Sequence, residues 1–144
     1  MSSLDLAVIG NCMIAALVDR RARIVWSCFP RFDSEPVFSA LLDSPDGRAD
    51  AEQRGVFAID QINMRTCEQA YLENTAVLVS TMTDASGNML EITDFAPRFT
   101  HYDRTFRPPQ IVRRVRPLRG RPRIRVRLRP HFEWGERQPD YTRG

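Results

Sequence analysis

Alternating apolar and polar residues run along most of the chain, and this period of two is typical of β-strands. Near the N-terminus the pattern predicts three strands in succession, each followed by a turn. Gly10 and Asn11 form the first turn, and Pro30 ends the third strand. The three strands, which we expect to form an antiparallel meander, cover residues 6–9, 13–18 and 23–29.

One segment predicts a helix rather than a strand. Ser34 stands where a helix N-cap is expected, directly before Glu35 and Pro36. Serine is a good N-cap and proline is tolerated in the first turn, so we expect a short helix around residues 35–42. A turn at residues 44–47 then ends this helix, and residues 48–54 are expected to form a loop.

Strands resume after this loop and continue to the end of the alternating pattern. The clearest hairpin joins two alternating segments through residues 84–87, which are small or polar. Residues 97–109 hold three prolines and are expected to form a loop. The predicted strands cover residues 55–60, 66–72, 75–83, 88–95, 110–117 and 121–130, the last two joined as a hairpin. Nine or ten short strands with little helix indicate an all-β fold, an antiparallel β-sandwich.

Charge is distributed unevenly along the chain. All 21 basic residues are arginine. Residues 1–106 carry nine Arg and fifteen acidic residues, whereas residues 107–144 carry twelve Arg and three acidic residues. Such an asymmetry indicates a partner surface near the C-terminal end of the sequence.

The arginines of the last predicted strand follow the strand period. In an extended conformation five of them project from one face, and Ile124, Val126 and Leu128 project from the other. The face is either solvated or packs on another domain or subunit, where guanidinium groups pair with carboxylates. Nucleic-acid binding is the weaker alternative, because no aromatic residue interleaves with these arginines. The five residues are Arg121, Arg123, Arg125, Arg127 and Arg129.

The bulk composition is that of an ordinary globular protein. Hydrophobic residues make up 42% of the chain and charged residues 27%, which excludes wholesale disorder. No basic segment followed by an apolar stretch marks a signal peptide, and the longest apolar run, Cys12 to Val18, is too short to cross a bilayer. We therefore expect a soluble, cytoplasmic protein with no membrane partner.

The cysteines and histidines predict neither a metal site nor a cofactor. Cys12, Cys28 and Cys67 are widely spaced and form no C-x-x-C pair, and neither His101 nor His131 is near them in the sequence. We expect reduced cysteines that fill core space.

Four carboxylates are candidates for acid–base chemistry, but they form no recognisable catalytic pattern. Glu91 and Asp94 lie in one predicted strand, and Asp33 and Glu35 follow shortly after Arg31. Acidic residues at turns and strand ends are usually solvated or capping. The sequence alone therefore assigns no catalytic residue.

Several aromatic residues cluster near prolines. We expect most of them to be core residues, with a few lining a saccharide-binding edge where an aromatic face stacks on a sugar ring. They are Trp26, Phe29, Phe32, Phe38, Phe95 and Phe99.

Several sequence blocks, in one order, resemble the opening of bacterial family 15 glycoside hydrolases of the glucoamylase and trehalase type. The first is Gly10 with the Ala-Ala-Leu-Val segment at residues 15–18, followed by the Trp26 strand and Arg-Phe-Asp-Ser at residues 31–34. Further blocks that resemble this family cover residues 36–42, 71–79, 90–99 and 111–115. The turn at Asn11 to Met13 and the glycine-free turn at residues 19–23 depart from the family pattern.

The resemblance implies a supersandwich-like β-sandwich over residues 1–135, with residues 136–144 beginning a linker to a catalytic (α/α)6 barrel that this chain lacks. It implies an inverting hydrolase of α-glucosidic bonds, in which both catalytic carboxylates belong to the barrel. The chain alone is then inactive, whereas the full-length protein is an enzyme. Its partners are its own catalytic domain and, in the full-length enzyme, an α-glucoside. The isolated domain exposes the sheet face that would otherwise meet the barrel, and it is expected to self-associate through that face.

One loop is a candidate for contact with the barrel. Arg31, Phe32 and Asp33, with Trp26 beneath them, follow the third strand and lie between prolines. The alternative is that Arg31 and Asp33 only fix the local turn. Two other functions remain open at this point: an autonomous carbohydrate-binding module, and an Arg-rich nucleic-acid-binding protein.

Overall fold

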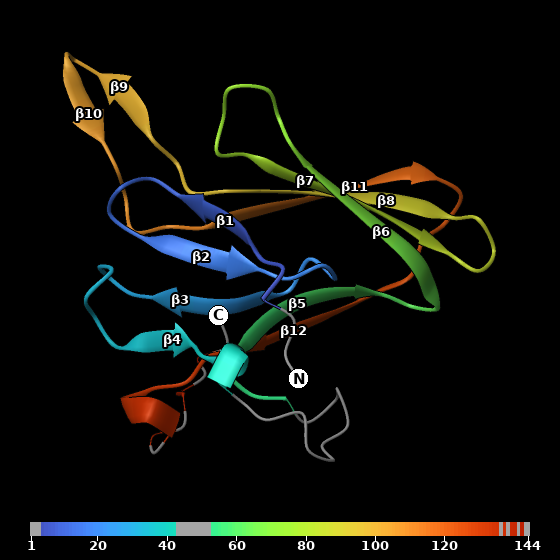
Figure 1. Cartoon of the computed structure of the whole chain (residues 1–144), viewed down its shortest axis with the longest axis horizontal. Coiled ribbons are helices and arrows are strands. Elements are labelled where there is room, and N and C mark those ends of the chain that lie inside the picture. Colours follow the sequence, from blue (N-terminus) through green and yellow to red (C-terminus); the bar gives the residue numbers. More distant parts are fainter. Residues whose placement is uncertain (1–3, 43–52, 136, 138, 141, 143–144) are drawn as a thin grey trace.

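The computed structural model describes residues 4–42, 53–135, 137, 139–140 and 142. Two antiparallel sheets face each other, and a two-stranded hairpin stands out from one end of them (Figure 1). The predicted all-β sandwich is confirmed.

The first sheet, sheet A, holds the N-terminal meander and two strands from later in the chain. Its order is β1-β2-β3-β5-β12, and β4 pairs with β3 beside this path. The bounds are β1 (Ala7–Gly10), β2 (Ala15–Val18), β3 (Ile24–Cys28), β4 (Pro36–Phe38), β5 (Val56–Gln61) and β12 (Ile124–Arg129).

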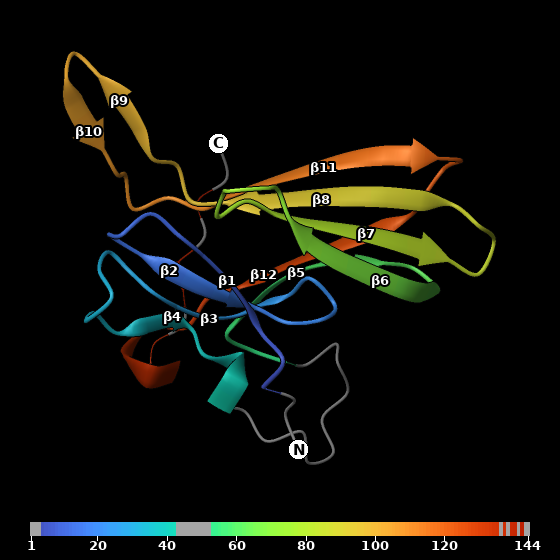
Figure 2. The ribbon, with the colours of Figure 1, turned by 45° about the horizontal axis from the view of Figure 1, so that its top comes forward.

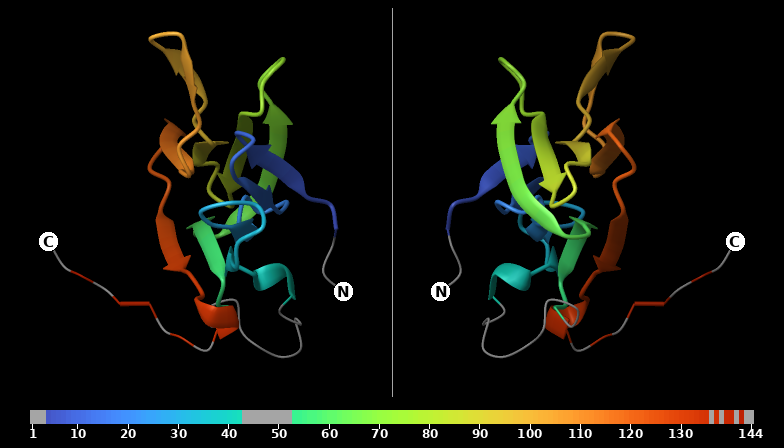
Figure 3. Two further views of the ribbon diagram at one scale, coloured as in Figure 1. Left: turned by 90° about the vertical axis from the view of Figure 1, so that its left-hand side faces the viewer. Right: turned by 90° about the vertical axis from the view of Figure 1, so that its right-hand side faces the viewer.

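The second sheet, sheet B, has the order β11-β8-β7-β6. Seen from the sides in Figure 3, β11 and β12 lie on the same side of the molecule. The bounds are β6 (Met64–Tyr71), β7 (Leu78–Asp84), β8 (Met89–Phe95) and β11 (Val112–Arg119).

The core lies between the sheets and follows the period of two. On β8, Leu90 and Ile92 are fully buried, while Glu91 between them is partly exposed. Ile9 and Ile24 of sheet A pack in one cluster with Leu78 of sheet B. Strand β5 is buried on both faces, because a further cluster with Val25, Ala40, Val56 and Ala58 lies on the opposite side from Phe57 and Ile59.

The predicted helix around residues 35–42 is wrong. Residues Pro36–Phe38 form β4, which pairs with β3, and only the 3-10 turn η1 (Ala40–Leu42) follows. Ser34 is not a helix cap, since its Oγ accepts a hydrogen bond from the Arg31 amide and closes the preceding turn. The alternation of Val37 with the buried Phe38 suits an edge strand as well as a helix. The predicted turn at residues 44–47 lies outside the described residues.

The last two predicted strands exist, but they are not a hairpin pair. Strand β11 pairs with β8 and β12 pairs with β5, so the connection crosses from one sheet to the other. Gly120 makes this crossing with a φ of 69°, and a Cβ there would lie 2.0 Å from the side-chain oxygen of Asn88. The alternation of polar and apolar residues indicates that a segment is a strand, but it does not indicate which other strand β11 or β12 pairs with.

Residues predicted as a loop form a two-stranded hairpin instead. Strands β9 (Phe99–His101) and β10 (Arg104–Phe106) are joined through Tyr102 and Asp103, both at positive φ. A two-residue turn with positive φ at both positions matches the twist of paired strands. This hairpin, which we call the arm, projects from the body of the sandwich (Figure 2).

Candidate functional surfaces

A buried ion pair within sheet B lies against sheet A. Arg113 of β11 and Asp94 of β8 lie opposite each other, with their side chains 2% and 0% exposed and 2.8 Å between Nε and Oδ1. Arg113 also donates to the carbonyl oxygens of Phe57 in β5 and of Ala22 in the turn between β2 and β3, and its guanidinium carbon lies 4.8 Å from the Phe57 ring centroid. One side chain thus satisfies a carboxylate in its own sheet, one carbonyl group of sheet A and one carbonyl group of the turn between β2 and β3.

This arrangement settles the position of the candidate carboxylates. Asp94 faces the core, whereas Glu91 lies on the opposite face of β8 and pairs with Arg116 at 3.0 Å. Two carboxylates on opposite faces of a strand cannot flank one bond. Asp33 pairs with Arg31, and Glu35 is exposed. Among the described residues, no group of three or more His, Cys, Asp or Glu could hold a metal ion.

The candidate loop after β3 forms a tight exposed turn. Arg31 and Asp33 pair at 2.8 Å with both side chains largely exposed, and Phe32 between them is also exposed. Trp26 is half-buried in β3, opposite Leu17 of β2. The turn is therefore held by its own side chains, and Phe32 is open to solvent.

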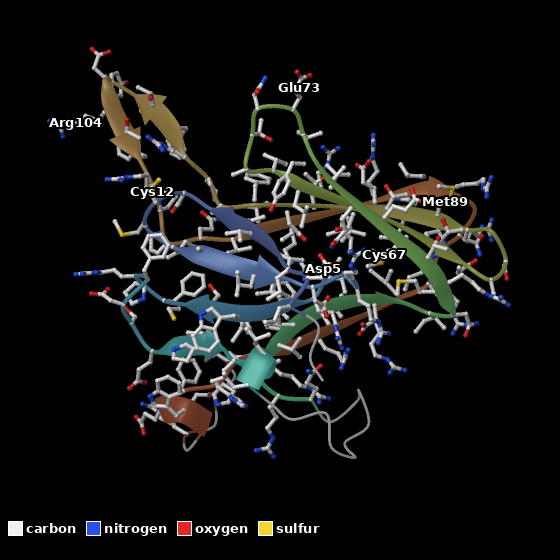
Figure 4. All side chains as sticks on the ribbon, in the orientation of Figure 1. Asp5, Cys12, Cys67, Glu73, Met89 and Arg104 are labelled. Carbon is white, nitrogen blue, oxygen red and sulfur yellow. The ribbon has the colours of Figure 1, made fainter. Side chains whose placement is uncertain are left out.

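A buried asparagine links the first turn to the base of the arm. Asn11 accepts hydrogen bonds from the amides of Met13 and Ile14 and donates to the carbonyl oxygens of Pro97 and Pro108. These prolines flank the arm on both sides. In Figure 4, Cys12 of this turn lies toward the arm, on which Arg104 is labelled. A turn that departs from the family pattern in sequence is thus tied to the chain about a hundred residues later.

The arm carries an aromatic surface beside a small pocket. The rings of Phe99 and Phe106 stack at 5.5 Å between centroids, and both are exposed. A pocket of about 340 Å³ opens here. Its lining residues are Met13, Phe99, Thr105, Phe106, Arg107 and Pro108. Of the aromatic residues singled out in the sequence, Phe38 is buried, Trp26, Phe29 and Phe95 are half-buried, and Phe32 and Phe99 are exposed.

The arginines of the last strand do not form one uniform exposed face. Arg127 is buried and pairs with Asp60 of β5 at 2.7 Å, and Arg129 is half-buried and donates to the carbonyl oxygen of Gln53. Arg125 is exposed, while Arg121 and Arg123 are exposed and precede β12. The apolar residues between them are exposed as well: Ile124 is 42%, Val126 58% and Leu128 52% exposed.

All three cysteines are free, but only two suit the expectation of core residues. Cys28 is buried, Cys67 is half-buried and Cys12 is exposed. Burial, with a smaller contribution from the Asp19 carboxylate, raises the pKa of the Cys67 thiol from 9.0 to about 11. Burial also raises the pKa of Cys28. Neither Cys28 nor Cys67 is therefore poised to act as a nucleophile.

No helix in the described part of the chain is long and apolar enough to cross a membrane.

Two antiparallel sheets that face each other across a buried apolar core define a β-sandwich domain. The chain belongs to the trehalase-like N-terminal family, whose model matches residues 4–141. The family resemblance drawn from the sequence blocks is confirmed at this level.

Curated relatives extend this result. A trehalase of Thermoplasma volcanium is 33% identical over 134 residues, which cover 91% of this chain and 20% of the relative. A trehalase of Thermoplasma acidophilum is 30% identical over 85% of this chain and 20% of its own length. Trehalase 1 of Sulfolobus acidocaldarius is 38% identical over 64% of this chain and 15% of its own length. The chain thus spans about a fifth of the length of the first two trehalases, and no solved structure matches it.

Proposed function

We propose that this chain is the non-catalytic N-terminal domain of an α-glucoside hydrolase, of the glucoamylase or trehalase type in family 15. The observation that carries this proposal is the coverage of the relatives. Proteins named trehalase match 91% of this chain with only 20% of their own length. Four-fifths of such a protein is available for the catalytic machinery.

The pairing of the candidate carboxylates favours a non-catalytic role for this domain, in which it packs against the catalytic domain. Each carboxylate that the sequence offered for acid–base work, except the exposed Glu35, is paired with an arginine. A glycosidase of the inverting type needs one carboxylic acid to protonate the leaving oxygen and one carboxylate to activate water. In our proposal a downstream barrel supplies both groups, and this domain packs against that barrel.

The contact with the barrel is proposed to involve the turn with Arg31, Phe32 and Asp33. The turn is exposed and fixed by its own ion pair, which leaves the Phe32 ring available for packing. Trp26 lies half-buried in β3, the strand from which the turn emerges. If this contact exists, replacing Phe32 by Ser in the full-length enzyme lowers its melting temperature. An unchanged melting temperature and turnover would mean that the turn does not contact the barrel and that Arg31 and Asp33 only fix the local turn.

The first experiment compares the full-length gene product with the 144-residue chain. We expect the longer protein alone to release glucose from trehalose or maltose. A coupled enzymatic assay measures the glucose released. Hydrolysis by the short chain would contradict the proposal and return attention to Asp33 and Glu35. Inversion is read by NMR from the anomer of the first glucose released.

A second candidate is an autonomous carbohydrate-binding module, which the stacked and exposed rings of Phe99 and Phe106 favour. Saturable calorimetric binding of maltose or trehalose by the 144-residue chain, lost in a Phe106→Ser variant, supports this function. The absence of binding at millimolar sugar excludes it.

We also infer a cytoplasmic location. The free cysteines Cys12, Cys28 and Cys67 support it, because exposed and half-buried thiols persist in a reducing compartment.

A further inference from the structure

The two edges of sheet A differ in how their backbone groups are satisfied. At the β1 edge, the hydroxyl of Tyr71 from sheet B accepts a hydrogen bond from the Val8 amide at 2.7 Å and donates to the Val8 carbonyl oxygen at 2.9 Å. One side chain thus covers both backbone groups of Val8. Edge strands that lack such cover are templates for pairing with another strand.

The backbone groups on the outer side of β12 can be identified from its pairing with β5. The amide of Ile62 donates to the carbonyl oxygen of Arg123. Hydrogen-bonded and non-hydrogen-bonded pairs alternate along an antiparallel ladder, so the register places the amides of Arg125, Arg127 and Arg129 toward β5. The amides and carbonyls of Ile124, Val126 and Leu128 therefore point away from β5, toward the open edge.

The side chains of the same three residues are also left open. They pair in register with Gln61, Ile59 and Phe57, and of these the last two face the space between the sheets. Yet Ile124, Val126 and Leu128 are 42–58% exposed. In sheet B, Val115 pairs with the buried Ile92 and is exposed as well. We call Val115, Ile124, Val126 and Leu128 the open strip.

We propose that, in the full-length protein, an extended segment that follows residue 144 pairs with the free edge of β12 as a further strand of sheet A and covers the open strip. Outward backbone groups and exposed apolar side chains at the same positions are what strand addition requires. The inference rests on the proposed function only in taking the rest of the same polypeptide as the partner.

The charge near β12 favours this occupant over a second copy of the chain. Arg123 and Arg125 are exposed on the face opposite the strip, and Arg114 is exposed on β11. A second copy would bring the same arginines to the interface, and like charges that face each other are unfavourable. A complementary strand carries apolar residues toward the strip and acidic residues on its other face. Relatives about five times longer than the matched region leave ample chain to provide it.

The test is residue-resolved amide hydrogen exchange on the full-length protein. In an uncovered edge strand, Ile124, Val126 and Leu128 exchange fast while Arg125 and Arg127 exchange slowly, so the strand contains its own control. Strand addition predicts slow exchange at all five positions. Fast exchange at the three outward amides would overturn the inference, and protection that rises with protein concentration would assign the edge to a second copy and overturn it as well.

A matched pair of variants tests the strip itself. Val126→Glu and Val8→Glu each place a carboxylate on an exposed edge-strand position, 58% and 49% exposed, at opposite edges of sheet A. In the full-length protein, we expect Val126→Glu to remove the protection of the outward β12 amides and Val8→Glu to leave it intact. Equal protection in both variants would contradict the proposal.

Trehalose and maltose hydrolysis in the same preparations separates the two proposals. Normal hydrolysis with fast-exchanging β12 amides refutes strand addition and leaves the proposed function standing. A protected β12 in a full-length protein without hydrolase activity refutes the proposed function and leaves strand addition standing.

Discussion

Arg113 concentrates more interactions than any other single side chain described above. It neutralises Asp94, donates to the carbonyl oxygens of Phe57 in sheet A and of Ala22 in the turn between β2 and β3, and stacks over Phe57. A buried ion pair adds little net stability over an apolar pair of the same shape, but removal of one partner leaves a buried charge without compensation. The largest effect on stability is therefore expected when one partner of the pair is removed.

Replacing Arg113 by Met is expected to lower the free energy of unfolding by about 3–5 kcal/mol, because Asp94 and two carbonyl groups lose their partner. The matched control is Arg116→Met, on the same strand and also paired with a carboxylate of β8, but half-exposed. Exposed pairs contribute about 0–1 kcal/mol, so the control should change little. Urea unfolding of both variants measures the difference in the free energy of unfolding. Equal losses in the two variants would mean that burial does not determine how much stability is lost when such a pair is broken.

The three thiols should differ in reactivity. At pH 8.5 we expect iodoacetamide to modify the exposed Cys12 first, while Cys28 and Cys67 react only as the protein unfolds, because their raised pKa values keep them protonated. Peptide mass spectrometry reads each site separately. Early modification of Cys67 would contradict its placement beside β7.

The Cys67 pKa also fixes the sign of a pH effect. The unfolded thiol ionises near pH 9, whereas the folded thiol ionises near pH 11. Between these values the unfolded state binds fewer protons, so the free energy of unfolding falls as pH rises. Denaturant titrations from pH 8 to 11 should show this loss, and a Cys67→Ala variant should show a smaller one.

At the scale of elements, local patterns in the sequence identified strands well and their partners poorly. The hairpin of β7 and β8 was predictable because both its strands and its turn at Asp84 lie within one short segment, where Asp84 accepts bonds from the Ser86 and Asn88 amides. The helix at residues 35–42 failed because a good N-cap, Ser34, also closes a turn. By contrast, nothing in the sequence close to β11 and β12 indicates that they pair with β8 and β5.

The same limit applies to the surfaces. The sequence placed five arginines on one strand face, but burial of Arg127 depends on Asp60, which is 67 residues away. The roles of Asn11 and Tyr71 were not foreseen either, since both contact residues far along the chain. The blocks that resemble the family contained Asp94 and Arg113, yet only the fold brings these residues together.

The turn at Asn11 should couple the sandwich to the arm. Asn11→Ala leaves the carbonyl oxygens of Pro97 and Pro108 and two amides without their partner, with an expected loss of about 2 kcal/mol in the free energy of unfolding. Asn11→Asp keeps the oxygen that accepts hydrogen bonds from the Met13 and Ile14 amides but loses the NH2 group that donates to the two proline carbonyl oxygens. If the coupling is real, hydrogen exchange in the arm accelerates in both variants, whereas the turn amides accelerate only in Asn11→Ala.

At the scale of the whole molecule, the uneven charge and the open strip act in opposite directions. The apolar residues of the strip favour association of isolated chains, and the arginines of the same region oppose it. Added salt screens the repulsion and leaves the apolar contribution in place. Light scattering of the 144-residue chain should therefore show self-association that increases from low to moderate salt. A monomer at all salt concentrations would contradict this prediction.

The long reach of Arg113 and Asn11 has a consequence for synthesis on the ribosome. Arg113 bonds to Ala22, 91 residues earlier, and Asn11 bonds to Pro108, 97 residues later. At translation rates of roughly 5–20 residues per second, the N-terminal meander waits on the order of 5–20 s before either contact can form. Until β7 is synthesised and Leu78 can pack on Ile9 and Ile24, β1, β2 and β3 are nascent strands with one uncovered apolar face. This first part of the interval is the period when the growing polypeptide most needs a chaperone.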